Sequence, residues 1–124
     1  MVKWFNLAVG SVIGGYARYL LAGFVHHIFG AAFPYGTLVV NLIGCFLIGL
    51  LAALAEEKFL LGPDARILLM VGFCGAFTTF STFMLETGNL IRDGEMIRAF
   101  LNVMASVVIG FLVFRLGVLL GEFI

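Results

Sequence analysis

Apolar residues dominate four long stretches of the chain, and short polar or turn-forming segments separate these stretches. They cover about residues 4–29, 36–55, 66–91 and 95–121, with turn signals at Pro34, Pro63 and Gly94. Each stretch has the roughly 20 residues that an apolar α-helix needs to cross the hydrocarbon core of a bilayer. The pattern predicts an all-α integral membrane protein in which residues 1–124 form a single domain of four transmembrane helices.

The composition supports this class and excludes others. Hydrophobic residues make up 63% of the chain and charged residues 11%, with a mean hydropathy of +1.18. Soluble domains are closer to half apolar and a quarter charged. The formal net charge is zero, so we expect no basic surface for nucleic acid. The sequence shows no nucleophile–base pair, metal-ligand cluster or phosphate-binding loop, and we therefore do not expect an enzyme.

The distribution of positive charge gives a weak orientation signal. With four spans both termini share one side, which carries Lys3, Lys58 and Arg66, while the other side carries Arg92 and Arg98. Such a small difference gives the positive-inside rule little to act on. Two interpretations stay open: insertion in both orientations, which would allow an antiparallel pair, or a fixed orientation set by one or two decisive charges.

Small residues recur at helical spacing near both ends of the chain. Gly10 and Gly14, and likewise Gly117 and Gly121, lie four residues apart. This spacing puts each pair on one helix face, where another helix backbone can approach closely. The motif predicts close helix packing and says nothing about a substrate.

The third apolar stretch carries the least ordinary segment. Four hydroxyl side chains occupy five positions, at Thr78, Thr79, Ser81 and Thr82. Such residues can bond backbone carbonyls and bend or open a helical turn, so we expect this helix to break near mid-membrane. A broken helix at that depth persists where a polar cavity or other protein satisfies its freed groups. The alternative is an intact helix whose hydroxyls bond its own carbonyls.

Helical spacing makes a second prediction about this segment. At about 100° per residue, one polar face should contain Gly75, Thr78, Thr82 and Glu86. Phe80 and Phe83 should then point to the opposite side.

Two other stretches contribute polar side chains at similar depth. Asn41 lies in the second stretch, and Asn102 and Ser106 lie one turn apart in the fourth. Each could be a hydrogen bond between helices, but three stretches with polar groups at one depth favour a shared polar path. Amides, hydroxyls and the positive edges of aromatic rings can all contact an anion. Neutral groups also bind weakly enough to permit release.

Three motifs carry a resemblance to a known family over nearly the whole chain. They are GGYARY at residues 14–19, GTLxxNxxG at 36–44 and GFxGxxTTFSTFxxE at 72–86. With them, the chain resembles the Fluc (CrcB) fluoride channels. The resemblance implies passive, selective export of fluoride through two pores in an antiparallel, dual-topology homodimer of the cell (inner) membrane. It also implies a structural Na⁺ on the two-fold axis, held by the backbone carbonyls of Gly75 and Thr78.

The same resemblance implies roles for individual side chains. Phe80 and Phe83 match the aromatic pair that lines each pore, and Asn41 matches the pore asparagine. Other positions expected along the pore are Ser81, Thr82, Ser106, Glu86 and Asn102. Asn102 stands where some relatives have tyrosine. Arg18 is either a vestibule residue that concentrates anions or an interfacial residue that reaches water.

Two other functions compete with the channel. A proton-coupled exporter of lipophilic cations, of the small multidrug-resistance type, would also be a four-span, dual-topology dimer. It needs a membrane-embedded carboxylate in the first span, where this chain has Arg18 and no acidic residue. A non-transporting accessory subunit would use the glycine faces for assembly alone, which leaves Asn41 and the hydroxyl cluster without a purpose.

Overall fold

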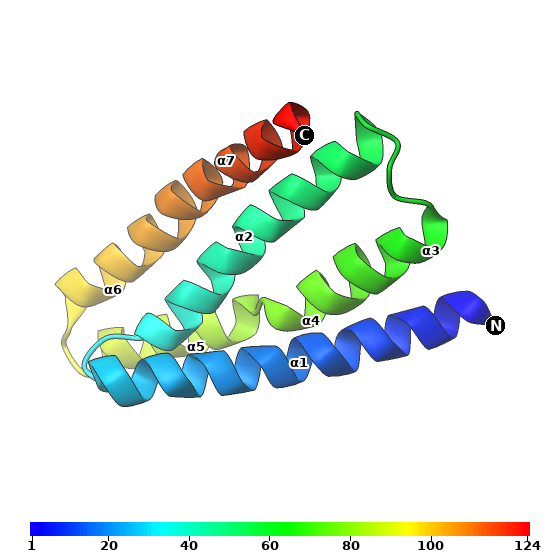
Figure 1. Cartoon of the computed structure of the whole chain (residues 1–124). Coiled ribbons are helices and arrows are strands. Elements are labelled where there is room, and N and C mark those ends of the chain that lie inside the picture. Colours follow the sequence, from blue (N-terminus) through cyan, green and yellow to red (C-terminus); the bar gives the residue numbers. More distant parts are fainter.

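The computed structural model describes all 124 residues, and every regular element in it is helical. Four helical rods follow one another along the chain (Figure 1). The first is α1 (Val2–Phe29) and the second is α2 (Tyr35–Glu56). The third consists of α3 (Pro63–Arg66), the π-wound segment η1 (Ile67–Cys74), α4 (Gly75–Phe77) and α5 (Phe80–Arg92). The fourth consists of α6 (Met96–Met104), η2 (Ala105–Ile109) and α7 (Gly110–Phe123), with η2 also π-wound.

The rods end where the sequence supplies a residue that breaks a helix. Gly30 and Gly94 adopt φ values of 83° and 78°, a region that glycine enters without steric cost, and they close α1 and the turn before α6. Pro63 begins the third rod, where its missing amide hydrogen costs nothing. Arg66 holds the preceding loop, because its guanidinium donates to the carbonyls of Ala55 and Leu61 at 2.6 and 3.1 Å.

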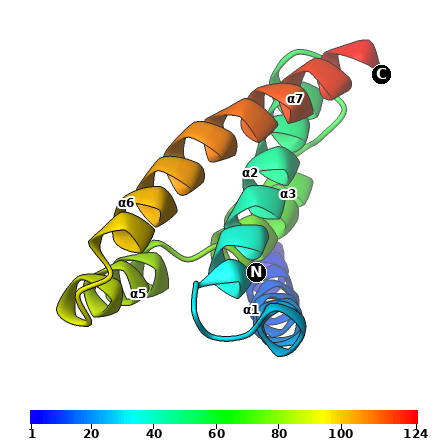
Figure 2. The same ribbon diagram turned by 90° about the vertical axis from the view of Figure 1, so that its left-hand side faces the viewer.

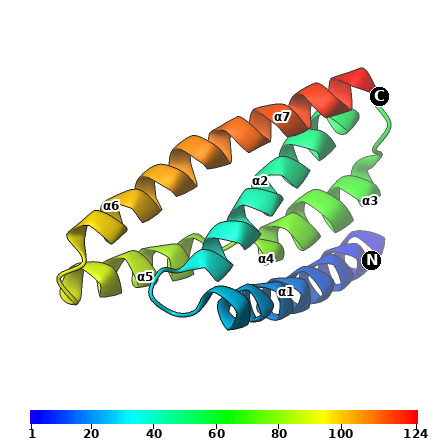
Figure 3. The ribbon, with the colours of Figure 1, turned by 60° about the vertical axis from the view of Figure 1, so that its left-hand side comes forward.

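The rods alternate in direction, and both chain termini lie at the same end of the molecule (Figure 3). Helix α2 packs along α7 on one side, while α1 packs along η1 and α4 on the other. Glycines make these contacts close. A side chain on Gly10 or Gly14 would overlap the backbone of η1, and one on Gly117 would overlap the Phe46 carbonyl of α2. The predicted close packing at the glycine pairs is confirmed.

The third rod does not stay beside α1 along its whole length. Its first half, up to α4, lies against α1, whereas α5 turns away to pack against α6 (Figure 2). The change of direction occurs at Thr78 and Thr79, which belong to no helix. The predicted break in the third helix is therefore confirmed.

The surface of the chain is that of a membrane protein. All four rods are long and apolar enough to span a bilayer, and only 21 of the 124 residues are buried. Most large apolar side chains therefore face outward, as a lipid environment requires. The rods extend from zero to three residues beyond the predicted spans at most ends, with the fourth beginning one residue late.

Candidate functional site

The break in the third rod is an extended two-residue linker. Thr78 has φ/ψ of −92°/157° and Thr79 has −149°/115°, both in the extended region. A side chain of the linker makes hydrogen bonds to the first turn of α5. The Thr79 hydroxyl accepts the amide hydrogen of Thr82 at 3.2 Å and donates to the Thr82 hydroxyl at 3.0 Å. Thr79 is thus the N-cap of α5, a position that favours threonine.

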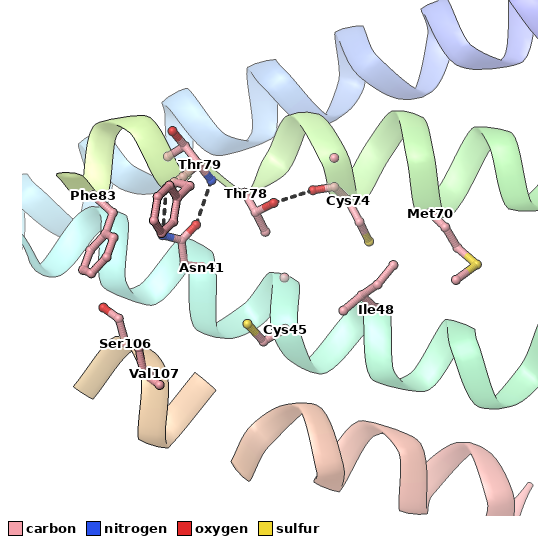
Figure 4. Close-up of a pocket in the computed structure, with 13 residues that line it drawn as sticks. Asn41, Cys45, Ile48, Met70, Cys74, Thr78, Thr79, Phe83, Ser106 and Val107 are labelled. Carbon is pink, nitrogen blue, oxygen red and sulfur yellow. Dashed lines mark hydrogen bonds between the residues drawn. The ribbon is translucent and has the colours of Figure 1, made fainter. Parts of the chain in front are cut away.

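Asn41 of α2 makes two hydrogen bonds to the backbone of the linker. Its Nδ2 donates to the Thr79 carbonyl at 3.0 Å, and its Oδ1 accepts the Thr79 amide hydrogen at 2.8 Å (Figure 4). In an unbroken helix that amide would donate to the carbonyl of Gly75. A side-chain amide carries one acceptor and two donors, so Asn41 can match both backbone groups of one residue. The chain can therefore open here without leaving the Thr79 backbone unpaired.

The end of α4 exposes carbonyls that the break has freed. Arg18 of α1 donates its Nε hydrogen to the Ala76 carbonyl at 3.0 Å. This places a cation at a helix C-terminus, where the macrodipole favours positive charge. No hydrogen bond outside the regular helices reaches the carbonyls of Gly75 or Thr78. The Thr78 hydroxyl turns back to the Cys74 carbonyl at 2.9 Å, and its methyl group meets Gly44 of α2.

A cavity of about 410 Å³ lies on one side of the break (Figure 4). Its wall brings together Asn41 and Gly44 of α2, the break itself, and Phe80 and Phe83 of α5. The two phenyl rings are tilted by 53° with centroids 5.7 Å apart. Ser106 of η2 completes this wall, and its Oγ is buried without a hydrogen-bond partner.

A second cavity, of about 370 Å³, lies on the other side. Arg18 and His26 line it from α1, Thr37 from α2, and Thr82 and Glu86 from α5. Glu86 Oε1 is buried and makes no hydrogen bond. Thr79 lines both cavities, so the linker separates the two hollows.

The predicted continuous polar face is wrong. Gly75 and Thr78 line the first cavity together with Phe80 and Phe83, whereas Thr82 and Glu86 line the second. A continuous face of this kind requires one uninterrupted helix across residues 75–86. Two extended residues in the middle rotate α5 relative to α4, so faces on either side of the break no longer align.

Asn102 occupies a different place from the other expected pore residues. It is 2% exposed and lines neither large cavity. Its Nδ2 donates to the Thr87 hydroxyl at 2.9 Å, and that hydroxyl donates to the Phe83 carbonyl at 2.8 Å. Asn102 therefore connects α6 to α5 through Thr87, whose hydroxyl bonds the carbonyl of Phe83 one turn earlier in α5. Ser81 is exposed at the start of α5, with its hydroxyl 3.5 Å from that of Thr79.

Sequence reasoning missed two residues of this arrangement. It did not give Thr79 an individual role, although threonine is among the residues favoured at a helix N-cap. It also missed Thr87, whose side chain is buried in a span and links Asn102 to the main chain. A lone threonine in an apolar helix gives no sequence signal for such a link, because the partner is 15 residues away.

Comparison with known proteins adds to this geometry. Residues 5–118 match the sequence profile of the family described as "CrcB-like protein, Camphor Resistance (CrcB)". Proteins named "Fluoride-specific ion channel FluC" are similar over most of their length. The one from Methylocella silvestris is 49% identical over 90% of this chain and 86% of its own. The one from Geobacter sulfurreducens is 54% identical over 82% of each chain.

A third such relative covers the whole molecule. The FluC protein of Maridesulfovibrio salexigens is 42% identical over 100% of this chain and 98% of its own. The matched region of this relative includes all four rods and the break, and the profile match covers far more than half of the residues. The chain is a member of the CrcB-like family.

Proposed function

We propose that the protein is a fluoride-selective channel that lets the anion leave the cell passively. The relatives that bear the name of a fluoride-specific channel align with this chain along nearly its full length. The observation that carries the proposal within this structure is the break at Thr78–Thr79. It places neutral hydrogen-bond donors and two phenyl rings around one cavity inside a membrane span.

The chemistry of that cavity suits a small anion. The start of α5 carries the positive end of the helix dipole, and its first amides have no partner within the helix. The edges of Phe80 and Phe83 carry partial positive charge and can contact an anion that has lost its water. The unpartnered Ser106 hydroxyl is a further donor on the same wall. Such neutral groups bind an anion without holding it too tightly for conduction.

The second cavity is suited to serve as a vestibule, through which anions reach the break. It extends from Thr79 and Thr82 at the break toward Pro34 in the loop after α1. Arg18 on its wall would draw anions toward the break, and Thr82 and Glu86 would lie along their route. In this assignment Asn41 and Ser81 flank the passage at the linker, while Asn102 supports it by fixing the backbone of Phe83.

The channel is proposed to be an antiparallel homodimer that inserts into the inner membrane in both orientations. Phe80 lines the first cavity but remains 73% exposed in the single chain, so this cavity lacks a wall. A second copy can supply that wall. Nearly equal positive charge at the two ends of the rods permits the inverted orientation that an antiparallel pair requires.

We propose that a structural Na⁺ binds at the dimer axis, beside the break in each chain. The carbonyls of Gly75 and Thr78 have no protein donor outside the regular helices, and both residues line the cavity that the partner would close. Unwound carbonyls of broken membrane helices are suitable oxygen ligands for Na⁺. The ion would neutralise these carbonyl dipoles where two chains meet. If so, thermal unfolding of the purified dimer should shift to lower temperature when N-methylglucamine replaces Na⁺, and an unchanged transition would contradict this assignment.

Anion efflux from liposomes tests the function itself. Vesicles that contain the purified protein should release fluoride and retain chloride. Phe80→Ile and Phe83→Ile should each abolish fluoride release, because the ring edges are lost while apolar volume is largely kept. Phe5→Ile, on an exposed side chain that lines neither cavity, is the matched control and should leave release unchanged. Proton-driven export of a lipophilic cation would support the multidrug-type exporter, but α1 carries Arg18 and no acidic residue.

A further inference from the structure

Three ionisable side chains determine the charge of the second cavity. Arg18 and Glu86 lie on its wall and have opposite charges, yet they form no ion pair with each other. The third is His26, which follows Arg18 on α1 by about 12 Å along the helix axis. His26 is exposed and lies in the last turn of α1, so it stands at the outer end of the cavity near Pro34.

Tyr19 is the other ionisable side chain on the cavity wall. The remaining ionisable groups near this opening do not line the cavity. His27 is the next residue along α1 and is also exposed, but it is absent from the cavity wall. The Tyr35 ring packs at a tilt against the rings of Phe29 and Phe33. On α6, Arg98 is 3.7 Å from Glu95 and 3.5 Å from the Ala32 carbonyl. The segment of α2 that faces the cavity contributes Gly36 and Thr37, neither of which ionises.

We propose that His26 controls the supply of anions to the pore according to its protonation. Histidine is the side chain whose charge ordinarily changes between pH 5 and 8. With neutral His26 the formal charges of Arg18 and Glu86 cancel, and with protonated His26 the cavity carries one net positive charge. A positively charged cavity concentrates anions at its mouth and raises their entry rate. His26 would act on the ion through its charge at the mouth of the cavity, before the ion reaches the break.

The expected effect is modest. A single charge at the mouth of a water-filled cavity should raise the local fluoride concentration roughly twofold at low salt.

The inference rests on the proposed fluoride channel, and electrical recording separates the two. The full-length protein is placed in a bilayer of uncharged lipid with equal fluoride and equal pH on both sides. Current is measured at about pH 7.5 and again at about pH 5.5. Neutral hydrogen fluoride carries no current, and symmetric solutions make the insertion orientation irrelevant. Absence of any fluoride current at the higher pH would refute the channel rather than the role of His26.

Three variants test His26. The unmodified protein and His27→Gln should show roughly twice the current at the lower pH. His26→Gln should show no increase, although it retains Glu86. His26→Lys should carry the higher current at both pH values. The increase should also shrink at high ionic strength, where charges on an open surface are screened. Acid stimulation that persists in His26→Gln, or that disappears in His27→Gln, would overturn the proposal.

Discussion

Asn41 and Thr79 form a two-bond contact in which one side-chain amide satisfies both the amide and the carbonyl of one backbone residue. The residues belong to different rods and lie 38 positions apart. The contact gives the Thr79 amide the partner that an unbroken helix would supply, and it adds a second donor to the Thr79 carbonyl within a membrane span. The stability of the break and its function therefore depend on the same side chain.

Replacing Asn41 by leucine should remove both hydrogen bonds to Thr79. It leaves the Thr79 amide without a partner and removes a second donor from the Thr79 carbonyl, and an unpaired backbone group away from water costs about 1–3 kcal/mol. We expect lower thermal stability of the purified protein and loss of fluoride efflux. The double variant Asn41→Leu/Leu42→Asn, which moves the amide to the neighbouring face of α2, is an informative control. If Asn41→Leu conducted normally, the linker would not need the contact.

Arg18 should matter through both its hydrogen bond and its charge. Arg18→Met removes the donor to the Ala76 carbonyl, a charge-assisted bond worth about 1.5–3 kcal/mol. It also removes the positive charge from the second cavity, so fluoride conduction should fall. Arg115→Met is the comparison, because Arg115 is exposed and makes no side-chain hydrogen bond or ion pair. Equal melting temperatures for the two variants would show that the Ala76 contact contributes nothing.

Adjacent glycines of α1 should respond in opposite ways to alanine. A methyl group at Gly14 would overlap the Phe73 carbonyl, whereas one at Gly15 would meet nothing within 4 Å. Gly14→Ala should therefore destabilise the protein by about 1–3 kcal/mol through overpacking. Gly15→Ala should be neutral or slightly stabilising, because alanine is the better helix former. Unfolding in detergent, monitored by circular dichroism, compares them directly. Equal losses of stability in the two variants would show that Gly14 does not make the close helix contact.

Asn102 and Thr87 should be energetically coupled. A double-mutant cycle with Asn102→Leu and Thr87→Val removes the hydrogen bond from either side. Coupling energies for such bonds between membrane helices average about 0.6 kcal/mol and reach about 1.7. Because Thr87 also donates to the carbonyl of Phe83, both single variants should reduce fluoride flux. Strict additivity of the two mutations would mean that the bond is absent in the membrane.

The sequence predicted the helical rods and the existence of the break for clear physical reasons. Apolar runs of membrane length leave few alternatives, and the hydroxyl cluster at residues 78–82 weakens a helix wherever it occurs. The geometry beyond the break was not predictable in the same way. The positions of Thr82 and Glu86 depend on how far two extended residues rotate α5, and no periodicity records that rotation.

Asn41 and Asn102 illustrate the same limit for individual side chains. Both are amides in apolar spans, and neither position indicates from the local sequence which group the side chain will contact. In the structure Asn41 contacts the backbone of Thr79, whose amide has no helical partner, whereas Asn102 contacts a hydroxyl on an intact helix. The partner of a buried amide is decided by the packing of the rods, which the local sequence does not describe.

Because an even number of rods returns the chain to its starting side, both ends of the protein emerge at the same end of the bundle. A reporter enzyme fused to the first or the last residue will therefore sample the same compartment. If molecules insert in a single orientation, a reporter that works only in the cytoplasm and one that works only in the periplasm will give exclusive signals. If molecules insert both ways, either fusion will be active in both assays, with intensities that give the proportion of each orientation.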